Sequence, residues 1–320
     1  MTRMRHSRDM LATQIETPVC QTRGRHPGTG KTAGEKWRFL NTRFRDAFFN
    51  MAVDEMLLTS VARGEGSPTL RIYGWQPPAL SFGYAQKIAR EVDLERCRET
   101  GIGLVRRVTG GRAVLHWNEL TYSVACREDD PLLGGTISET YHKISRCLVE
   151  GLRIFGVKTQ LERSRSLPTR PRRESISSPC FSSTAKHEVT LQGRKLIGSA
   201  QRRLQGMILQ HGSLLIGPEH KRMVDLLPSD SGVLREQFVQ ALDCGTIYLQ
   251  EVYPEKVDFH KLGECLRQGF ERCLDVEFFG NGLLEREKTE AVRLVREKYS
   301  TDTWNFSPSK ALEKLERDTP

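Results

Sequence analysis

The stretch 187–216 constrains the fold more than any other part of this sequence. It contains three segments in which apolar and polar residues alternate, 187–191, 195–203 and 207–216, and the pair Gln192-Gly193 separates the first two. Alternation with a period of two is typical of β-strands, and a short turn that contains glycine joins antiparallel neighbours. The pattern therefore predicts an antiparallel meander.

Further strands and helices are expected on both sides of this meander. Strand patterns occur at 37–40, 70–75, 79–82, 104–108, 113–116, 120–124 and 276–279. Helical spacing occurs at 47–58, 93–99, 138–155, 257–274 and 284–299. Because strands and helices each come in runs, we expect an α+β protein with a mixed, largely antiparallel sheet flanked by helices on one side.

Composition divides the chain into three parts. Residues 1–36 show no periodicity, so we expect a disordered basic tail. Residues 37–255 are expected to form one domain, which is interrupted by a flexible segment at 161–186 rich in Ser, Arg and Pro. Residues 256–320 are expected to form a helical extension packed on the same domain.

The positive charge of the chain is concentrated in two places. Lys and Arg number 49 against 40 Asp and Glu, a net charge of +9. Residues 1–36 hold seven basic and three acidic residues, and 161–174 hold five and two. A nucleic-acid groove carries its charge on a folded face. A basic nucleic-acid-binding module is therefore the lowest-ranked interpretation, and no nucleic-acid partner is expected.

The apolar and cysteine patterns exclude several other classes of protein. No apolar run approaches the roughly 18 residues that span a bilayer, and the first residues lack the apolar core of a secretory signal. The eight cysteines lie far apart without a CxxC pair, which predicts neither a disulfide framework nor a metal site. We expect a cytoplasmic protein with no membrane partner and no metal.

The segment from Arg106 to His116 contains the densest signal for a functional site. It reads RRVTGGRAVLH, in which Gly110 and Gly111 let main-chain amides approach a ligand closely. A plain β-turn is the usual explanation of a Gly-Gly pair, but the two preceding arginines and His116 favour a binding site. A second glycine-rich stretch, 28–32, is not a phosphate loop because Arg25 occupies the position of its first glycine.

Three further groups of residues are candidates for a catalytic or binding role. Cys180 lies at the end of the basic flexible segment, where positive charge could stabilise a thiolate, whereas the other cysteines are expected to be small apolar fillers. Lys195 begins a strand in which small residues follow it. The remaining candidates are the small or polar residues of this strand and the next one: Gly198, Ser199, Ala200, His211 and Gly212.

Taken together, these segments resemble the biotin/lipoate protein ligase superfamily, in particular its LipM-type octanoyl-[acyl carrier protein]:protein N-octanoyltransferases. The matching stretches are RRVTGGRAVLHWNELTYS, NMAVDEMLL, PCF, GRKLIGSAQRR and ILQHGSLL. The resemblance is strong over 37–216 and weaker over the C-terminal helices, and residues 1–36 have no counterpart.

The resemblance implies an acyltransferase of the biotin/lipoate protein ligase catalytic-domain fold that needs no cofactor. It would transfer octanoyl from octanoyl-acyl carrier protein to a lysine of a lipoyl domain, in a glycine cleavage H protein or a 2-oxoacid dehydrogenase E2. Cys180 would carry the acyl group as a thioester, and Lys195 would lower the pKa of that cysteine. The residues implied in substrate binding are Arg106, Gly110, Gly111, Arg112, His116, Gly198, Ser199, Ala200, His211 and Gly212.

Two related activities remain open from the sequence. One is ATP-dependent lipoate–protein ligation on the same fold, which proceeds through an adenylate and needs no cysteine. Ligases typically carry a third glycine where this chain has Arg112, so Arg112 and Cys180 both favour transfer from a thioester. The other is an amidotransferase that moves octanoyl between two protein domains, which also uses a cysteine.

Overall fold

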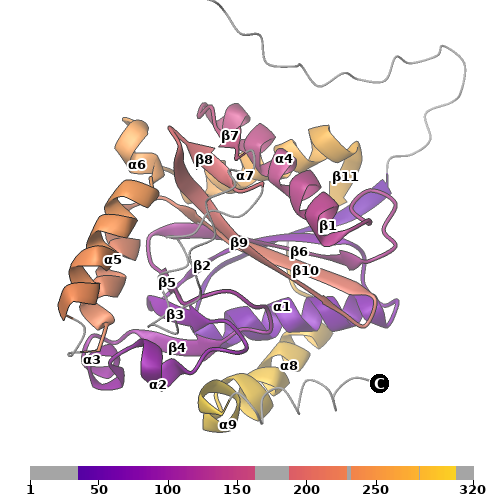
Figure 1. Cartoon of the computed structure of the whole chain (residues 1–320). Helices are drawn as coiled ribbons and strands as arrows, with labels where there is room; N and C mark the ends of the chain where they lie inside the picture. The colour runs from indigo at the N-terminus through magenta and orange to yellow at the C-terminus, as the bar shows by residue number, and fades with distance from the viewer. Residues whose placement is uncertain (1–34, 163–186, 229–231, 281, 308–320) are drawn as a thin grey trace, which may run out of the picture. The chain divides into compact units, whose positions relative to one another are not determined.

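Two β-sheets organise the part of the protein that the computed structural model describes, namely residues 35–162, 187–228, 232–280 and 282–307 (Figure 1). The larger sheet has the strand order β11 (Val276–Phe279), β1 (Glu35–Arg45), β2 (Thr69–Trp75), β6 (Glu119–Arg127), β10 (Met207–Leu215), β9 (Arg194–Leu204), β8 (Val189–Leu191) and β7 (Gln160–Leu161). The smaller sheet has the order β4 (Gly103–Arg106), β3 (Ala79–Phe82) and β5 (Val114–His116).

Strand directions confirm the expected mixed, largely antiparallel sheet. In the larger sheet β1 runs parallel to β2 and to β11, and the other neighbouring strands run antiparallel. The meander predicted from 187–216 corresponds to β8, β9 and β10.

The expectation of a single sheet with helices on one side is wrong. The pair Pro77-Pro78 follows β2, and because proline lacks the N–H group that continues a ladder, the chain leaves the larger sheet there. The next strands, β3, β4 and β5, pair only with one another within the described part of the chain. Helices cover both faces of the larger sheet, with α1 and α8 on one face and α4 and α7 on the other (Figure 1).

Helix α1 (Ala47–Ala62) begins where Asp46 accepts a hydrogen bond from the backbone N–H of Phe49 (2.9 Å). Such a cap satisfies one of the free donors of the first turn. Most of the helix is buried, and its buried residues include Asn50 and Asp54 as well as apolar side chains. A carboxylate inside an apolar core requires partners there, and those of Asp54 are described below.

Helices α4 (Ile137–Phe155) and α7 (Phe259–Leu274) pack together on the opposite face. A capping box between Thr136 and Glu139 starts α4, and Gly156, with φ of 104°, ends it in the left-handed conformation. Glycine adopts this conformation at little cost. The expected helix 138–155 is thus confirmed.

The remaining helical elements are short and lie around the two sheets. They are α2 (Ile88–Glu91), α3 (Leu94–Glu99), the 3₁₀ segment η2 (Pro218–Leu226), α5 (Gly232–Gly245), α6 (Leu249–Val252), α8 (Glu285–Leu294), the π-helical turn η3 (Val295–Tyr299) and α9 (Asp302–Phe306). The expected helix 284–299 corresponds to α8 together with η3. The sequence pattern did not locate η2, α5, α6 or α9 individually.

Two segments of the expected domain organisation lie outside the described residues. Residues 1–34 of the expected tail are not described, and Glu35 and Lys36 belong to β1, where they pair with Val276 and Glu277. The expected flexible segment begins at Leu161, which lies in β7, but residues 163–186 are not described. The domain boundaries therefore stay predictions.

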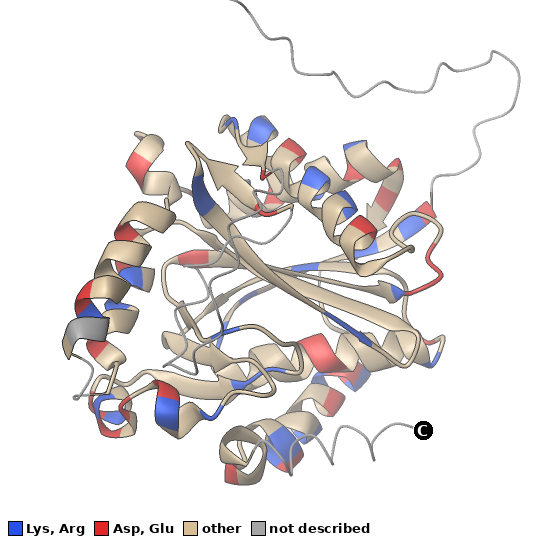
Figure 2. Ribbon diagram, in the orientation of Figure 1, with Lys and Arg blue, Asp and Glu red and all other residues tan. Residues whose placement is uncertain are grey.

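Charged residues of both signs are interspersed along the surface helices (Figure 2). Ion pairs within or between these helices include Arg153–Glu150, Lys221–Asp243 and Arg293–Glu290. Within the described ranges, none of the helices has the length and apolar content needed to cross a membrane.

Candidate active site

A pocket lies where α1, the larger sheet and the smaller sheet meet. Residues from six strands, from α1 and from the loop after β4 line it: Met51, Tyr73, Trp75, Ser81, Arg107, Val114, His116, Thr121, Gly198, Ser199, Ala200, His211, Gly212 and Ser213. Six of the predicted substrate-binding residues are among them, namely His116, Gly198, Ser199, Ala200, His211 and Gly212. The pocket thus brings together segments that are far apart in the sequence.

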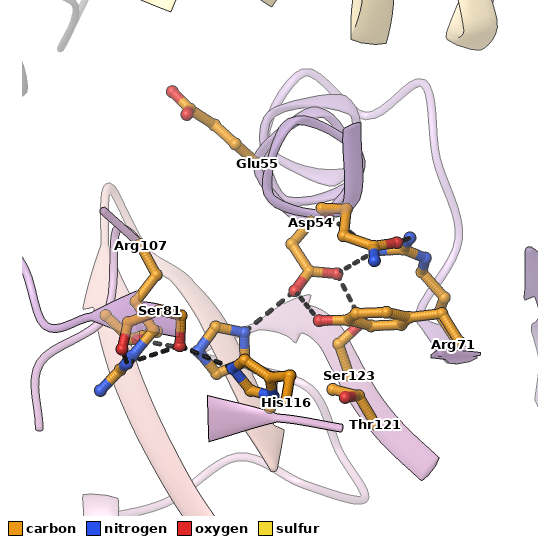
Figure 3. Close-up of polar contacts among 12 residues, drawn as sticks. Asp54, Glu55, Arg71, Ser81, Arg107, His116, Thr121 and Ser123 are labelled. Atoms are coloured by element: carbon orange, nitrogen blue, oxygen red, sulfur yellow. Dashed lines mark hydrogen bonds and ion pairs between the residues drawn. The ribbon is translucent and has the colours of Figure 1, made fainter. Parts of the chain in front are cut away.

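One wall of the pocket contains a hydrogen-bonded series of three side chains, which we call the Ser81 network. Glu119 Oε1 accepts from His116 Nδ1 (2.7 Å). His116 Nε2 lies 2.7 Å from Ser81 Oγ (Figure 3). With the ring proton on Nδ1, Nε2 accepts the hydroxyl proton of Ser81. The His116 ring also stacks on Trp75, with centroids 3.9 Å apart and planes 10° apart. These contacts fix the orientation of the imidazole.

Opposite charges lie at the two ends of the Ser81 network. Arg107 Nη1 donates to Ser81 Oγ (2.8 Å) at one end. At the other end the carboxylate of Glu119 also accepts hydrogen bonds from Thr121 (2.5 Å) and Ser213. Arg107 and Glu119 are both buried. The network therefore holds a neutral hydroxyl and an imidazole between a buried cation and a buried carboxylate.

A second series of the same type, the Thr109 network, lies in the core and contributes only His211 to the pocket wall. Thr109 Oγ1 lies 2.6 Å from His211 Nε2, and His211 Nδ1 lies 2.9 Å from Asp54 Oδ2. Burial is the largest influence on the pKa of His211 and lowers it, and the bond to Asp54 opposes that shift only in part. His211 is therefore neutral near pH 7, with Nδ1 donating to Asp54 and Nε2 accepting from Thr109.

Asp54 binds four partners from three elements. Besides His211, it accepts hydrogen bonds from Arg71 Nη1 (2.6 Å), Ser123 Oγ (2.8 Å) and the Tyr73 hydroxyl (2.8 Å), as Figure 3 shows. Burial raises the pKa of Asp54, but the Arg71 guanidinium and the bonds from His211 and Ser123 outweigh it, so the pKa lies below its usual value. The carboxylate is ionised at neutral pH and ties α1 to the sheet.

The polar groups of the pocket walls already have hydrogen-bond partners. Every polar side chain that lines the pocket, including Ser199, which bonds to the Tyr122 hydroxyl (2.8 Å), has a hydrogen-bond partner within the protein. A ligand group that enters such a space need not supply hydrogen bonds, and the walls also include Met51 and Val114. The pocket is suited to an uncharged, apolar chain.

The turn after β4 takes its shape from Arg107. Its Nη2 atom donates to the backbone carbonyls of Gly110 (2.9 Å) and Arg112 (2.7 Å). Gly111 has φ of 92°, and a Cβ added at Gly83 would lie 2.1 Å from the Gly111 carbonyl oxygen, so the two backbone segments are in close contact. Gly110, Gly111 and Arg112 are not among the residues that line the pocket, and their role in substrate binding stays a prediction.

Arg106 has a different environment from its neighbour. Its guanidinium donates to the backbone carbonyls of Tyr84 (2.7 Å), Trp304 (2.9 Å) and Asn305 (2.5 Å). It is fully buried and does not line the pocket. Arg106 therefore joins the smaller sheet to α9, and its predicted contact with substrate is not tested.

At position 212 of β10 the neighbouring strand residues leave room only for glycine. A Cβ at this position would lie 2.4 Å from Ser199 Oγ and 2.7 Å from the Tyr122 ring. The close backbone approach that a strand glycine indicates is thus present, and it is to Ser199 and Tyr122. Together with Gly198 and Ala200, Gly212 leaves the pocket free of large side chains on this wall.

Lys195 lies at the start of β9 in a buried ion pair. Its Nζ atom is 2.6 Å from Glu188 Oε1, and each of the two side chains is 3% exposed. The backbone carbonyl of Lys195 accepts from the N–H of Ile247 (3.0 Å), which holds this end of the strand in place. Cys180 lies outside the described residues, so the structure does not place it relative to Lys195.

The other cysteines divide into two groups. Cys97, Cys126, Cys147 and Cys265 are buried, as expected for small apolar fillers, but Cys244 and Cys273 are exposed. The expectation is therefore wrong for these two thiols. Cys273 lies in the last turn of α7 and Cys244 near the end of α5, where the pattern of apolar spacing does not show which face is covered. Cys20 lies outside the described residues.

Several residues of the site escaped the sequence analysis. Asp54, Glu119 and Glu188 each stand beside another polar residue in the sequence, so no local pattern marked them as buried carboxylates with partners. Ser81 carried no signal either, because its partners Arg107 and His116 lie on other segments of the chain. Arg107 belongs to the arginine pair before Gly110, but only Arg106 was assigned to substrate binding.

Within the described ranges, no group of three or more His, Cys, Asp or Glu side chains is arranged to hold a metal ion.

Comparison with known proteins gives matches over most of the chain. Residues 46–271 match the family model described as the lipoyl protein ligase A/B catalytic domain. The octanoyltransferase LipM of Moorella thermoacetica is 40% identical over 270 residues, which are 84% of this chain and 97% of that protein. The octanoyltransferase LipM of Staphylococcus aureus is 37% identical over 273 residues, 85% of this chain and 99% of that protein.

Solved structures show the same fold at lower identity. A lipoate-protein ligase A crystallised with ATP has a TM-score of 0.66 at 24% identity and covers 86% of this chain and 99% of its own. A bipartite lipoate protein ligase from Thermoplasma acidophilum has a TM-score of 0.70 at 24% identity, with 86% and 97% covered. At this identity the likeness concerns the fold alone.

Proposed function

The chain belongs to the lipoyl protein ligase A/B catalytic-domain family, and on that premise we propose that it is an octanoyltransferase of lipoate biosynthesis. The proposed donor is octanoyl-acyl carrier protein, and the acceptor is a lysine of a lipoyl domain, in a glycine cleavage H protein or a 2-oxoacid dehydrogenase E2. LipM octanoyltransferases from several organisms, matched over nearly their whole length, support this assignment.

The observation that carries the proposal is a buried ammonium group on the same strand as the pocket wall. Lys195 is the second residue of β9, and Gly198, Ser199 and Ala200 of that strand line the pocket. The pocket suits an octanoyl chain because its polar wall groups already have hydrogen-bond partners within the protein. Lys195 would then act at the thioester end of the acyl group.

The first proposed step forms a thioester on Cys180. This cysteine lies eight residues before Glu188 in the sequence, and the Glu188 carboxylate binds the Lys195 ammonium. A neighbouring cation favours a thiolate over a thiol. The Cys180 thiolate would attack the carbonyl carbon of the donor, a new C–S bond would form, and the carrier-protein thiolate would leave and take up a proton.

The second proposed step transfers the acyl group to the acceptor. The lysine of the lipoyl domain loses a proton, and its amine attacks the Cys180 thioester. The amide C–N bond forms, the C–S bond breaks, and the Cys180 thiolate is regenerated. Because the donor is already a thioester, neither step consumes ATP.

Glu188 is proposed to hold Lys195 in position for both steps. The two side chains are almost fully buried, and a buried ammonium without a carboxylate partner is strongly unfavourable. The pair also fixes the direction of the long lysine side chain, which would otherwise have many rotamers.

Intact-mass measurement tests the proposal directly. The full-length protein, incubated with octanoyl-acyl carrier protein in the absence of ATP, should gain one octanoyl group that hydroxylamine removes. Addition of a lipoyl domain should discharge the group onto that domain. The Cys180→Ala variant should lose both the adduct and the transfer, whereas Cys244→Ala, which removes an exposed thiol of the described chain, should keep both.

Three other results would redirect the assignment. An adduct that persists in Cys180→Ala would show that a different group carries the acyl chain. Strict dependence on ATP with free octanoate as donor would identify a ligase. Acylation by an octanoylated protein domain but not by the carrier protein would identify an amidotransferase.

A further inference from the structure

Helices α4 and α7 approach each other closely through two glycines. A Cβ added at Gly269 would lie 2.4 Å from the backbone nitrogen of Gly151 and 2.5 Å from the carbonyl oxygen of Cys147. A Cβ at Gly151 would lie 2.7 Å from Cα of Leu266. Such distances allow only glycine, so the two backbones are in direct contact here.

Two cysteines flank this contact on the same side. Cys147 lies four residues before Gly151 on α4, and Cys273 lies four residues after Gly269 on α7. Residues four apart share one face of a helix. Because the two helices run antiparallel, the step from Gly151 back to Cys147 and the step from Gly269 on to Cys273 lead in the same direction, and each cysteine lies about one turn from the contact. Cys273 Sγ is 3.8 Å from the carbonyl oxygen of Arg146, the residue next to Cys147.

The two thiols differ in exposure and in acidity. Cys147 is buried, and Cys273 is exposed. The neighbouring Cys147 side chain is the largest influence on the pKa of Cys273 and lowers it. Burial is the largest influence on the pKa of Cys147 and raises it well above its usual value, and the Cys147 thiol donates to the Lys143 carbonyl (3.3 Å). An exposed, more acidic thiol in contact with a buried one is the arrangement of an attacking and a resolving cysteine.

We propose that Cys147 and Cys273 form a redox-active pair that small disulfides or peroxides oxidise to a disulfide between α4 and α7. The proposal does not depend on the octanoyltransferase activity, because neither thiol lines the pocket.

The exchange with glutathione disulfide balances in two steps. The Cys273 thiolate attacks one sulfur of the oxidant, the S–S bond of the oxidant breaks, and one glutathione leaves as thiolate and takes up a proton. The Cys147 thiol then loses its proton and attacks Cys273 Sγ, which expels the second glutathione. Two protein thiols are oxidised, and one glutathione disulfide is reduced to two glutathione molecules.

Peptide mass mapping after treatment of the folded, full-length protein with glutathione disulfide tests the pair. The wild type should yield a peptide linked through Cys147 and Cys273, and dithiothreitol should separate it. In Cys147→Ala, Cys273 should instead retain a bound glutathione. In Cys273→Ser, which alters an exposed side chain, Cys147 should remain reduced because it is buried. Cys244, the exposed cysteine of α5, is the matched control and should retain glutathione in every variant.

Thermal unfolding gives a second measurement. A disulfide between residues so far apart in the sequence should raise the unfolding temperature by roughly 5 °C, and neither cysteine variant should respond to the oxidant in this way. Stable glutathionylation of Cys273 in the wild type, to the same extent as Cys244, would overturn the proposal. So would a disulfide from Cys273 to any other cysteine.

Discussion

The Ser81 network and the Thr109 network share one design and differ in where their arginine lies. Each joins a hydroxyl, an imidazole and a carboxylate by hydrogen bonds of 2.6 to 2.9 Å. In the Thr109 network, Arg71 binds the carboxylate itself, at 2.6 Å from Asp54. In the Ser81 network, Arg107 binds the hydroxyl at the opposite end from Glu119.

This difference separates a structural role from a role in the pocket. Arg71 and Asp54 neutralise each other within the core and connect β2 to α1. Arg107 and Glu119 keep their charges apart, and the side chains between them, Ser81 and His116, line the pocket. We therefore expect changes in the Thr109 network to affect mainly stability and changes in the Ser81 network to affect mainly acyl transfer.

The largest expected effect comes from Asp54→Asn. The variant leaves the buried Arg71 guanidinium without its carboxylate, which should reduce the free energy of unfolding by about 3–5 kcal/mol. Urea unfolding followed by circular dichroism measures this loss. Asp129→Asn, which changes an exposed carboxylate paired with Arg127, is the control and should leave stability nearly unchanged. A loss below about 1 kcal/mol for Asp54→Asn would remove the structural role of this network.

A smaller loss of stability is expected for Glu119→Gln. The carboxylate has three hydrogen-bond donors but no arginine, so the cost should be about 1–3 kcal/mol. The amide can donate to His116 Nδ1 and so move the ring proton to Nε2, which reverses the bond to Ser81. Acyl transfer to a lipoyl domain should slow roughly tenfold or more under conditions where the variant is folded. An unchanged transfer rate would show that both networks are only structural.

The smallest expected effect is a dependence of stability on pH. Burial lowers the pKa of His211, and it lowers that of His220 to about 4. The unfolded chain therefore binds protons first as the pH falls, and the contribution of each histidine is complete above about pH 6.5 and is lost toward its folded pKa. His220 alone should remove about 1 kcal/mol between about pH 7 and pH 5.5.

Unfolding curves at these two pH values measure that dependence. His220→Asn and His211→Asn should each flatten it, and the flattening in His211→Asn reports on the Thr109 network directly. A His211→Asn protein with the wild-type pH slope would mean that the pKa of His211 is the same in the folded and unfolded states.

Local sequence signals identified most of the strands and helices. Alternation over 187–216 predicts three strands that the structure contains, and helical spacing over 47–58 predicts most of α1. Such features depend on neighbours within a few residues. The separation into two sheets escaped prediction because strand pairing depends on contacts between distant segments, as in β1, which lies between β2 and β11.

The same distinction applies to the candidate site. His116, His211 and the small residues of β9 and β10 were predicted from motifs and do line the pocket. The resemblance implied Arg106 in substrate binding, whereas Arg107 is the arginine at the pocket, because two adjacent residues at the end of a strand face different surroundings that only the folded chain defines. Glu188 was missed because its partner, Lys195, reaches it across a hairpin. The predicted nucleophile, Cys180, stays a prediction.

The contact between Arg106 and α9 has a consequence for how the protein is made. Arg106 binds Trp304 and Asn305, which lie about two hundred residues further along the chain, and it precedes the arginine that shapes the pocket turn. During synthesis on the ribosome, this anchor is therefore missing until residue 305 has emerged. The nascent polypeptide must keep the smaller sheet in an incomplete state for most of its translation, a period in which exposed strand edges are open to chaperones and to aggregation.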